Sequence, residues 1–98
     1  MRVNVFDYVN DDTAIAYDDG KKCLDAIIDV IDKEKVIIDF AGIDYVITAF
    51  LNPLIGDLIL KKGNGVMKNI DIQNANDGII EKIKIVKNGA LLKREDIR

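Results

Sequence analysis

The amino-acid sequence predicts an α/β fold, a small sandwich in which a mixed, mostly parallel sheet of four strands packs against about three helices. Strand-like and helix-like segments alternate in the order β-β-α-β-α-β-α, and this alternation favours a largely parallel sheet covered by helices. The 98 residues suffice for one hydrophobic core and are too few for two, so residues 1–98 are expected to form a single domain. A chain with 49% hydrophobic and 32% charged residues is globular rather than disordered.

The first part of the chain is expected to form two strands and the start of a helix. Residues 2–9 alternate between valine and other side chains in the manner of a strand. Residues 10–12 have turn chemistry, and residues 13–17 are expected to return as a short second strand. Asp18 or Asp19 is then expected to cap the first helix, because a carboxylate there accepts hydrogen bonds from amides that have no helical partner.

The first helix is expected to be amphipathic and roughly four turns long. Cys23, Ile27 and Ile31 recur at helical spacing and form its apolar face. Cys23 is therefore expected to be a small buried hydrophobic side chain rather than a reactive thiol.

The most strand-like segment is residues 35–40, whose continuous β-branched run is typical of a central strand buried on both faces. Ala41 and Gly42 end this strand. The next helix carries apolar side chains at helical spacing. Pro53 is expected to lie in its first turn, because a proline in the interior would clash and remove a hydrogen bond. Residues 63–65 are expected to end that helix.

The last part of the chain is expected to add one strand and one helix. Residues 66–73 alternate between apolar and polar side chains and predict the strand. Asn76 or Asp77 is expected to cap the helix. The Asn-Gly pair at 88–89 is expected to end it, which leaves residues 89–98 as a tail or a short extra helix.

The residue types that are missing exclude most kinds of catalytic site. The chain contains no His, no Ser and no Trp. It therefore lacks the usual general base near neutral pH, the usual hydroxyl nucleophile and the commonest zinc ligand. No His/Cys cluster, Gly-rich phosphate loop or calcium-loop spacing is present. The sequence predicts a protein that is not an enzyme and that holds no cofactor and no metal.

The charge of the chain is unevenly distributed. Residues 1–60 hold 5 basic and 12 acidic side chains, whereas residues 61–98 hold 9 basic and 5 acidic ones. Such an asymmetry can steer a charged partner or favour head-to-tail self-association, and it can equally reflect solvated faces. The basic residues are scattered without interleaved aromatic residues, which argues against nucleic-acid binding.

The sequence predicts a cytoplasmic protein that does not bind membranes. No apolar run approaches the length of a membrane span, and the first residues lack a signal-peptide pattern. The single cysteine cannot form an internal disulfide, which agrees with a reducing compartment.

Residues 36–56 carry a family resemblance. A buried strand ends in Asp-Phe, a glycine–hydrophobic pair follows, then a threonine, and Phe-Leu-Asn opens the next helix. The matching residues are Asp39, Phe40, Gly42, Ile43, Thr48, Phe50, Leu51 and Asn52. This arrangement resembles the STAS-like domains of unknown function, relatives of the bacterial anti-sigma-factor antagonists. Residues 69–74 and the helix after them fit the family's last strand and helix.

The resemblance implies a regulatory module that binds another protein. In the antagonists, the loop and helix start after the central strand dock onto an ATP-binding, histidine-kinase-like partner. That partner phosphorylates a hydroxyl there, and the phosphate breaks the complex. Thr48 falls on or beside the position of that hydroxyl and is the expected phosphate acceptor. Asp44, Tyr45, Thr48 and Asn52 are the residues expected to bind the partner.

Two departures from the antagonists leave another role open for Thr48. The antagonists place Asp before the phosphorylated hydroxyl and a small Ser-Gly pair after it, where this chain has Ile47 and then Ala49 and Phe50. Thr48 could merely cap the second helix. Asn52 could likewise cap a helix that begins there.

Two other kinds of function also stay open. The charge asymmetry could drive the assembly of a structural or oligomerising module. Asp39, Asp44 or Asp57 could serve an enzyme or a small-molecule site. However, a strand-end Asp39 that bonds loop amides is a common structural feature, and loop exposure alone explains Asp44 and Tyr45 equally well.

Overall fold

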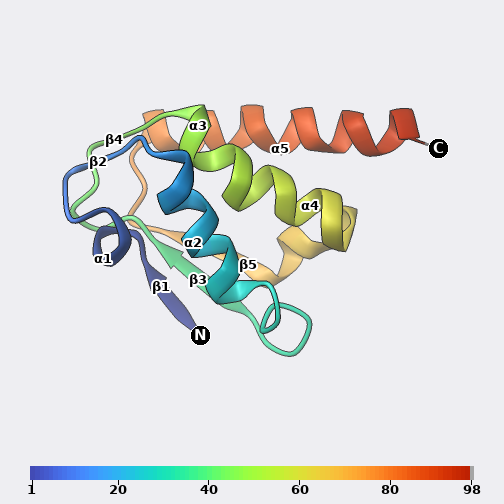
Figure 1. Cartoon of the computed structure of the whole chain (residues 1–98), viewed down its shortest axis with the longest axis horizontal. Helices are drawn as coiled ribbons and strands as arrows, with labels where there is room; N and C mark the ends of the chain where they lie inside the picture. The colour runs from blue at the N-terminus through green and yellow to red at the C-terminus, as the bar shows by residue number, and fades with distance from the viewer. Residues whose placement is uncertain (98) are drawn as a thin grey trace.

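The chain folds as helices packed on a small parallel sheet, with a second pair of short strands at one end (Figure 1). This computed structural model describes the backbone of residues 1–97 and the side chains of residues 1–63 and 65–93. In chain order the elements are β1 (Arg2–Asn4), α1 (Val5–Val9), β2 (Thr13–Ala14), α2 (Tyr17–Ile27), β3 (Val36–Asp39), β4 (Tyr45–Val46), α3 (Thr48–Leu51), the π-helix η1 (Asn52–Gly56), α4 (Asp57–Lys62), the 3-10 helix η2 (Asn64–Asn69), β5 (Ile70–Gln73) and α5 (Asp77–Ile97).

The three-stranded sheet has β3 at its centre, paired in parallel with β1 on one side and with β5 on the other. Val3 and Ile38 are neighbours across the sheet, and both are buried beneath the helices. The opposite face of the sheet is less covered, since Ile37 is half-buried and Asp71 is exposed. The prediction that residues 35–40 form a central strand is confirmed, although only one face of the sheet is fully buried.

The number of strands differs from the prediction. The described residues form five strands in two sheets, because β2 and β4 pair with each other as a separate parallel pair. The Asp12 carbonyl accepts a hydrogen bond from the Asp44 amide (2.7 Å), and the Ala14 carbonyl accepts one from the Ile47 amide (3.1 Å). These contacts turn part of the loop expected after β3 into a strand of two residues, too short to give an alternating pattern.

The core lies between the larger sheet and three helical elements, namely α2, α5 and the central helical run (residues 48–62, comprising α3, η1 and α4). The central helical run contributes six completely buried side chains, which are Phe50, Leu51, Leu54, Ile55, Leu58 and Ile59. No described helix combines the length and the apolar character that a bilayer span requires.

The first strand is shorter than predicted. Only Arg2–Asn4 pairs in the sheet, and Val5–Val9 forms the helix α1. Val5 and Val9 are four residues apart, so the same valines that alternate as in a strand also share one face of a helix. The helix ends at Asn10, which adopts the left-handed conformation (φ 53°) and donates its amide hydrogen to the Phe6 carbonyl.

The helix α2 begins and ends earlier than predicted. It starts at Tyr17 without a side-chain cap, so neither Asp18 nor Asp19 is the capping residue. Both carboxylates lie in the first turn, where the helix dipole favours negative charge. The regular helix ends at Ile27 rather than after four turns, yet Ile31 in the following turns is still completely buried.

The prediction that Pro53 lies in the first turn of the second helix is wrong. Helical backbone starts at Thr48, and Pro53 lies within the central helical run, in its π-helical part. The Asp57 amide there bonds the Asn52 carbonyl five residues earlier. This wider turn accommodates a residue that has no amide hydrogen to donate, which an uninterrupted α-helix does not. Gly63 ends the run with a positive φ of 100°, as predicted.

The C-terminal part differs at both of its predicted boundaries. Residues 64–69 form a 3-10 helix, so the last strand is limited to Ile70–Gln73. Of the two residues expected to cap α5, Asn76 is the cap, because its Oδ1 accepts a hydrogen bond from the Ile79 amide (2.9 Å). Helix α5 continues through Gly89 to Ile97, so residues 89–97 are neither a tail nor a separate helix, and residue 98 lies outside the described residues.

Candidate functional site

The residues expected to bind a partner lie along the segment from β4 to the start of η1. Asp44, Tyr45, Thr48 and Asn52 are all exposed. Thr48 is the first residue of α3 and follows the extended residue Ile47 (φ −118°). The chain therefore presents the Thr48 hydroxyl at the corner where a short strand becomes a helix.

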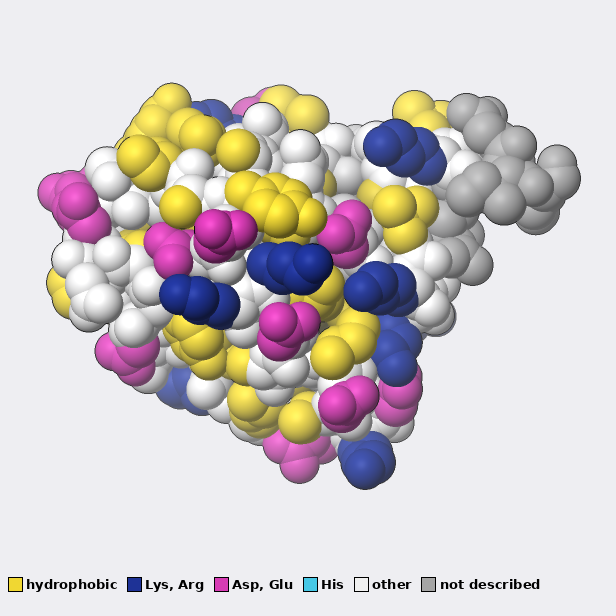
Figure 2. Space-filling view, in the orientation of Figure 1, with side chains coloured by type: hydrophobic (Ala, Val, Ile, Leu, Met, Phe, Trp, Pro, Cys, Tyr) yellow, Lys and Arg dark blue, Asp and Glu magenta, His cyan; other side chains and the backbone are white. Residues whose placement is uncertain are grey.

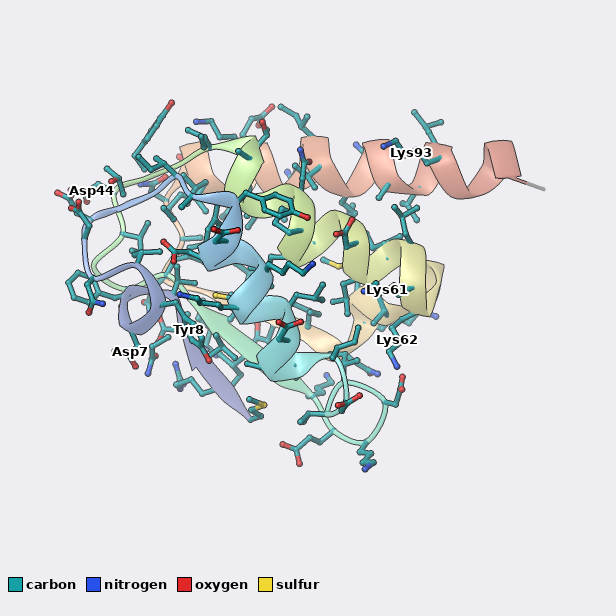
Figure 3. All side chains as sticks on the ribbon, in the orientation of Figure 1. Asp7, Tyr8, Asp44, Lys61, Lys62 and Lys93 are labelled. Carbon is teal, nitrogen blue, oxygen red and sulfur yellow. The ribbon has the colours of Figure 1, made fainter. Side chains whose placement is uncertain are left out.

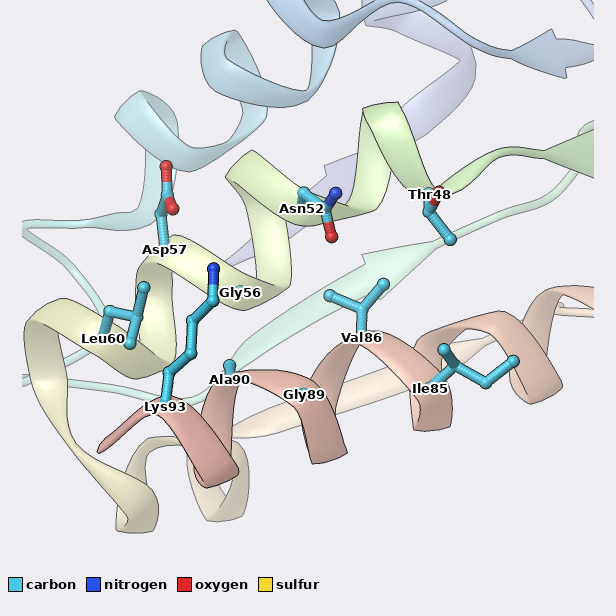
Figure 4. Close-up of a pocket in the computed structure, with 10 residues that line it drawn as sticks. All are labelled: Thr48, Asn52, Gly56, Asp57, Leu60, Ile85, Val86, Gly89, Ala90 and Lys93. Carbon is cyan, nitrogen blue, oxygen red and sulfur yellow. The ribbon is translucent and has the colours of Figure 1, made fainter. Parts of the chain in front are cut away.

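A groove of about 420 Å³ runs between the central helical run and α5 (Figure 4). Thr48 and Asn52 lie toward one end of the groove, and Asp57 and Lys93 toward the other (Figure 4). The lining residues are Thr48, Asn52, Gly56, Asp57, Leu60, Ile85, Val86, Gly89, Ala90 and Lys93. The structure thus brings three residues singled out in the sequence, Thr48, Asn52 and Asp57, to one surface.

The wall that α5 contributes to this groove was not predicted. The expected helix stop at 88–89 made the residues beyond it a tail or a short extra helix of the domain. Gly89 instead continues the helix, and a Cβ atom there would meet no atom within 4 Å, whereas one at Gly56 on the opposite wall would lie in ordinary contact with Val86 Cγ1, at 3.5 Å. A glycine inside an apolar helical pattern was the available signal, because such a residue can mark a packing or functional need as well as a stop.

Four polar side chains of the groove have no partner among the described residues. Thr48, Asn52, Asp57 and Lys93 make no side-chain hydrogen bond or ion pair with any described residue. A hydroxyl, an amide, a carboxylate and an ammonium group are therefore all available to a bound molecule. Together they can donate and accept hydrogen bonds and offer both signs of charge.

The capping roles considered for Thr48 and Asn52 are both wrong. Ile47 occupies the N-cap position of α3, and no side chain caps that helix. Asn52 lies inside the central helical run, where its amide bonds the Thr48 carbonyl. Neither side chain is needed to begin a helix.

Asp44 and Tyr45 belong to a different part of the surface. They do not line the groove, and Asp44 lies at the β2–β4 end of the molecule, far from Lys93 (Figure 3). The Asp44 carbonyl accepts a hydrogen bond from the Asn76 side chain (2.9 Å). Tyr45 is 50% exposed, and the Lys82 ammonium lies 3.9 Å from the centre of its ring. This cation–π contact anchors β4 to α5.

Asp39 ends β3, and hydrogen-bond donors surround it. Its Oδ1 accepts hydrogen bonds from the Asn74 side chain and the Ala41 amide (both 2.9 Å), and its Oδ2 pairs with the Arg2 guanidinium. The Asn74 side chain, then the Ala41 amide and the Arg2 charge, lower the pKa of the Asp39 carboxyl below its ordinary value. Both oxygens are occupied, which favours a structural role over that of a site carboxylate.

Cys23 is completely buried on α2, as predicted. Burial, helped by the negative charge of Asp19, raises the pKa of the Cys23 thiol to about 12. A nucleophilic thiolate is therefore suppressed near neutral pH. Within the described part of the chain, no group of three His, Cys, Asp or Glu residues could hold a metal ion.

The comparisons with known proteins identify a family and give no function. No curated protein and no solved structure matches the chain. One family model, that of the STAS-like domain of unknown function (DUF4325), matches residues 19–79, which include α2, β3 and the whole central helical run. A match over more than half of the chain agrees with the resemblance around residues 36–56, and this chain belongs to that family of STAS-like domains.

Proposed function

We propose that this STAS-like domain is a non-catalytic regulatory module of the bacterial cytoplasm that binds another protein through the surface around Thr48. Phosphorylation of Thr48 would control the binding. The observation that carries the proposal is the position of Thr48, an exposed hydroxyl without a partner at the first residue of α3 and at one end of the groove. Asn52 extends this surface along the groove, and Asp44 and Tyr45, at the β2–β4 end outside the groove, would form a second contact with the same partner.

A phosphate at Thr48 would change the surface more than the fold. A phosphothreonine carries a charge of about −1.5 to −2 near neutral pH. At the start of a helix, the free amides and the helix dipole favour negative charge, so α3 would tolerate it. A partner docked there would have to desolvate or pair the new charge, and that cost would weaken the complex. The resemblance to the anti-sigma-factor antagonists supports an ATP-binding, histidine-kinase-like protein as the partner.

Two variants of Thr48 test the proposal. Thr48→Glu adds a negative charge in a position where water still reaches it, so its melting temperature should stay within a few degrees of the parent's. It should nevertheless lose the partner. Thr48→Val removes the hydroxyl and keeps the shape, so it should bind the partner and accept no phosphate. The measurements are capture of the histidine-kinase-like protein on each immobilised variant, and the mass of each variant after incubation with that protein and ATP.

Three results would contradict the proposal in different ways. Equal binding by Thr48→Glu and the parent would mean that the docking surface lies elsewhere. Unfolding of Thr48→Glu would mean that the hydroxyl is part of the core. Phosphate transfer to Thr48→Val at the parent's level would mean that another residue accepts the phosphate.

A second candidate is binding of a small molecule in the groove beside Asp57. The groove volume of about 420 Å³ lies within the usual range of ligand pockets, roughly 300–1,000 Å³. Asp57 and Lys93 would provide opposite charges at one end. A screen of metabolites by thermal shift tests this candidate. A shift that disappears in Asp57→Asn would support it over the protein-binding function.

The charge asymmetry of the chain gives less support to an oligomerising module. On the face seen in Figure 2, basic and acidic side chains are intermingled rather than gathered into areas of one sign. Light scattering tests this alternative, because a head-to-tail assembly would gain mass with concentration and lose it with added salt.

A further inference from the structure

A second surface, separate from the groove at Thr48, lies where β5 meets α5. We propose that the outer edge of β5 and the apolar hollow beside it bind an extended, acidic peptide segment of a partner protein, which adds to the sheet as a further strand. The hollow is lined by Met67, Ile72, Ile80, Ile83, Lys84 and Lys87.

The outer side of β5 offers free backbone groups. In the described part of the chain, β5 pairs with β3 and with no strand on its other side. The Gln73 carbonyl accepts a hydrogen bond from the Phe40 amide (2.9 Å), so Gln73 faces β3. Alternate residues of a parallel strand face the same neighbour, so the amide and carbonyl of Ile72 point outward. The Ile70 amide is already bonded to the Met67 carbonyl, which makes Ile72 the centre of the free edge.

The hollow lies beside this edge and measures about 230 Å³. Its floor is aliphatic, and Ile80 is 38% exposed there. Ile72 belongs to both features, because its side chain lines the hollow while its backbone forms the edge. In a paired strand, the residue opposite Ile72 points to the same face of the sheet. The central side chain of an added strand would therefore enter the hollow.

The charges at the rim define the rest of the ligand. Lys84 and Lys87 are one turn apart on α5, and neither forms an ion pair with a described residue. They lie on the same side of the sheet as the hollow, so they would face residues two positions away from the central one. The expected segment therefore has the pattern Glu-x-Ile-x-Glu, with polar residues at x facing the open side of the sheet.

A fluorescein-labelled peptide, Thr-Glu-Thr-Ile-Thr-Glu-Thr, tests the proposal on the full chain. Its fluorescence anisotropy should rise and saturate, and amide NMR shifts should be confined to residues 70–73 and 80–87. Two further peptides, N-methylated on alternate sets of amides, test the strand geometry. One set points toward β5 and should abolish binding, whereas the other points away and should leave it intact.

Two pairs of substitutions test the rim. Lys84→Glu with Lys87→Glu should weaken peptide binding about tenfold or more, most clearly at low salt. The matched control is Lys21→Glu with Lys22→Glu on α2, which changes the same charge at exposed positions and should bind as the parent does.

The proposal is overturned if the peptide does not saturate, if both N-methylated peptides bind equally, or if the two lysine pairs behave alike. It is also overturned if the chain is a dimer whose interface covers β5. None of these results bears on the Thr48 groove, which α5 lines with different residues.

Discussion

The two sides of the central helical run differ in how closely they are packed. On one side the run packs against α2, and Gly20 allows that contact. A Cβ atom at Gly20 would lie only 2.1 Å from the Phe50 carbonyl oxygen. On the other side the run faces α5 across the groove, where a Cβ atom at Gly89 would meet no atom within 4 Å. A glycine thus permits close packing at the interface with α2, whereas at the interface with α5 a glycine lies beside open space.

This difference separates the part of the molecule that holds the fold from the part available to a ligand. The side toward α2 contains the completely buried Cys23 and Ile27. The side toward α5 combines empty space with polar groups that have no described partner, such as Thr48 and Asp57. Substitutions at the close-packed side should therefore change stability most, and substitutions in the groove should change binding most.

The largest expected effect is that of Gly20→Ala. The added methyl group would overlap backbone atoms of Phe50 and would also meet Pro53 Cγ at 2.9 Å, so α2 must move away from the central helical run. Overpacking costs about 1–3 kcal/mol and occasionally more, and the closeness of this contact favours the upper end, a large part of the stability of a small domain. Urea denaturation measures the loss. A loss below about 1 kcal/mol would show that the α2 interface is less rigid than its geometry indicates.

Labelling of Cys23 provides an independent measure of the same change. The thiol is completely buried one turn after Gly20, so a thiol reagent should react with it only when α2 separates from the core. Cys23 in Gly20→Ala should react faster than in the parent. An unchanged labelling rate would place the structural disturbance elsewhere.

An intermediate effect is expected at Asp39, which lies on the tightly held side of this comparison. Both of its carboxylate oxygens have hydrogen-bond or ion-pair partners. The pKa of Asp39 is lowered in the fold, so its charge contributes stability above the pKa of the unfolded chain, about 3.9. This contribution is lost as the pH falls through the lower pKa of the folded state. The stability difference between the parent and Asp39→Asn should therefore be complete at neutral pH and shrink below about pH 4. Denaturation curves across this range measure it, and a difference independent of pH would contradict it.

The predictable parts of the fold were those that depend on local pattern. The β-branched run at residues 35–40 identified the central strand, and Asn76 was one of two neighbouring residues expected to cap the last helix, because each signal resides in neighbouring residues. Pro53 was misplaced because the rule against interior prolines assumes an α-helix, whereas the chain forms a π-helical turn there.

The groove depends on contacts between distant segments, and so the sequence did not indicate it. The resemblance implied Thr48 and Asn52 as partner-binding residues, whereas Asp57 was a candidate only for a separate enzyme or small-molecule site. Their common surface exists only because α5 continues past Gly89 and lies opposite them. A Gly at 89 favours ending a helix by local propensity, but burial of Val86 and Ala90 stabilises the helix across this position.

The smallest expected effect, and the one of opposite sign, is that of Gly89→Ala. Gly89 lies in the interior of α5, its φ is not positive, and no neighbouring atom requires a glycine there. Alanine at such a position lowers the conformational entropy of the unfolded chain and should stabilise the fold by roughly 0.5–1 kcal/mol.

Urea denaturation of Gly89→Ala beside Gly20→Ala compares the two sides directly, because each variant adds one methyl group to a helix glycine. Opposite signs are expected. If Gly89→Ala also destabilises the chain, α5 must lie closer to the central helical run than the groove allows, and the distinction between a closed and an open side fails. If it stabilises the chain, the natural glycine lowers stability without any structural need. That outcome is the one expected if the groove must stay open for a ligand.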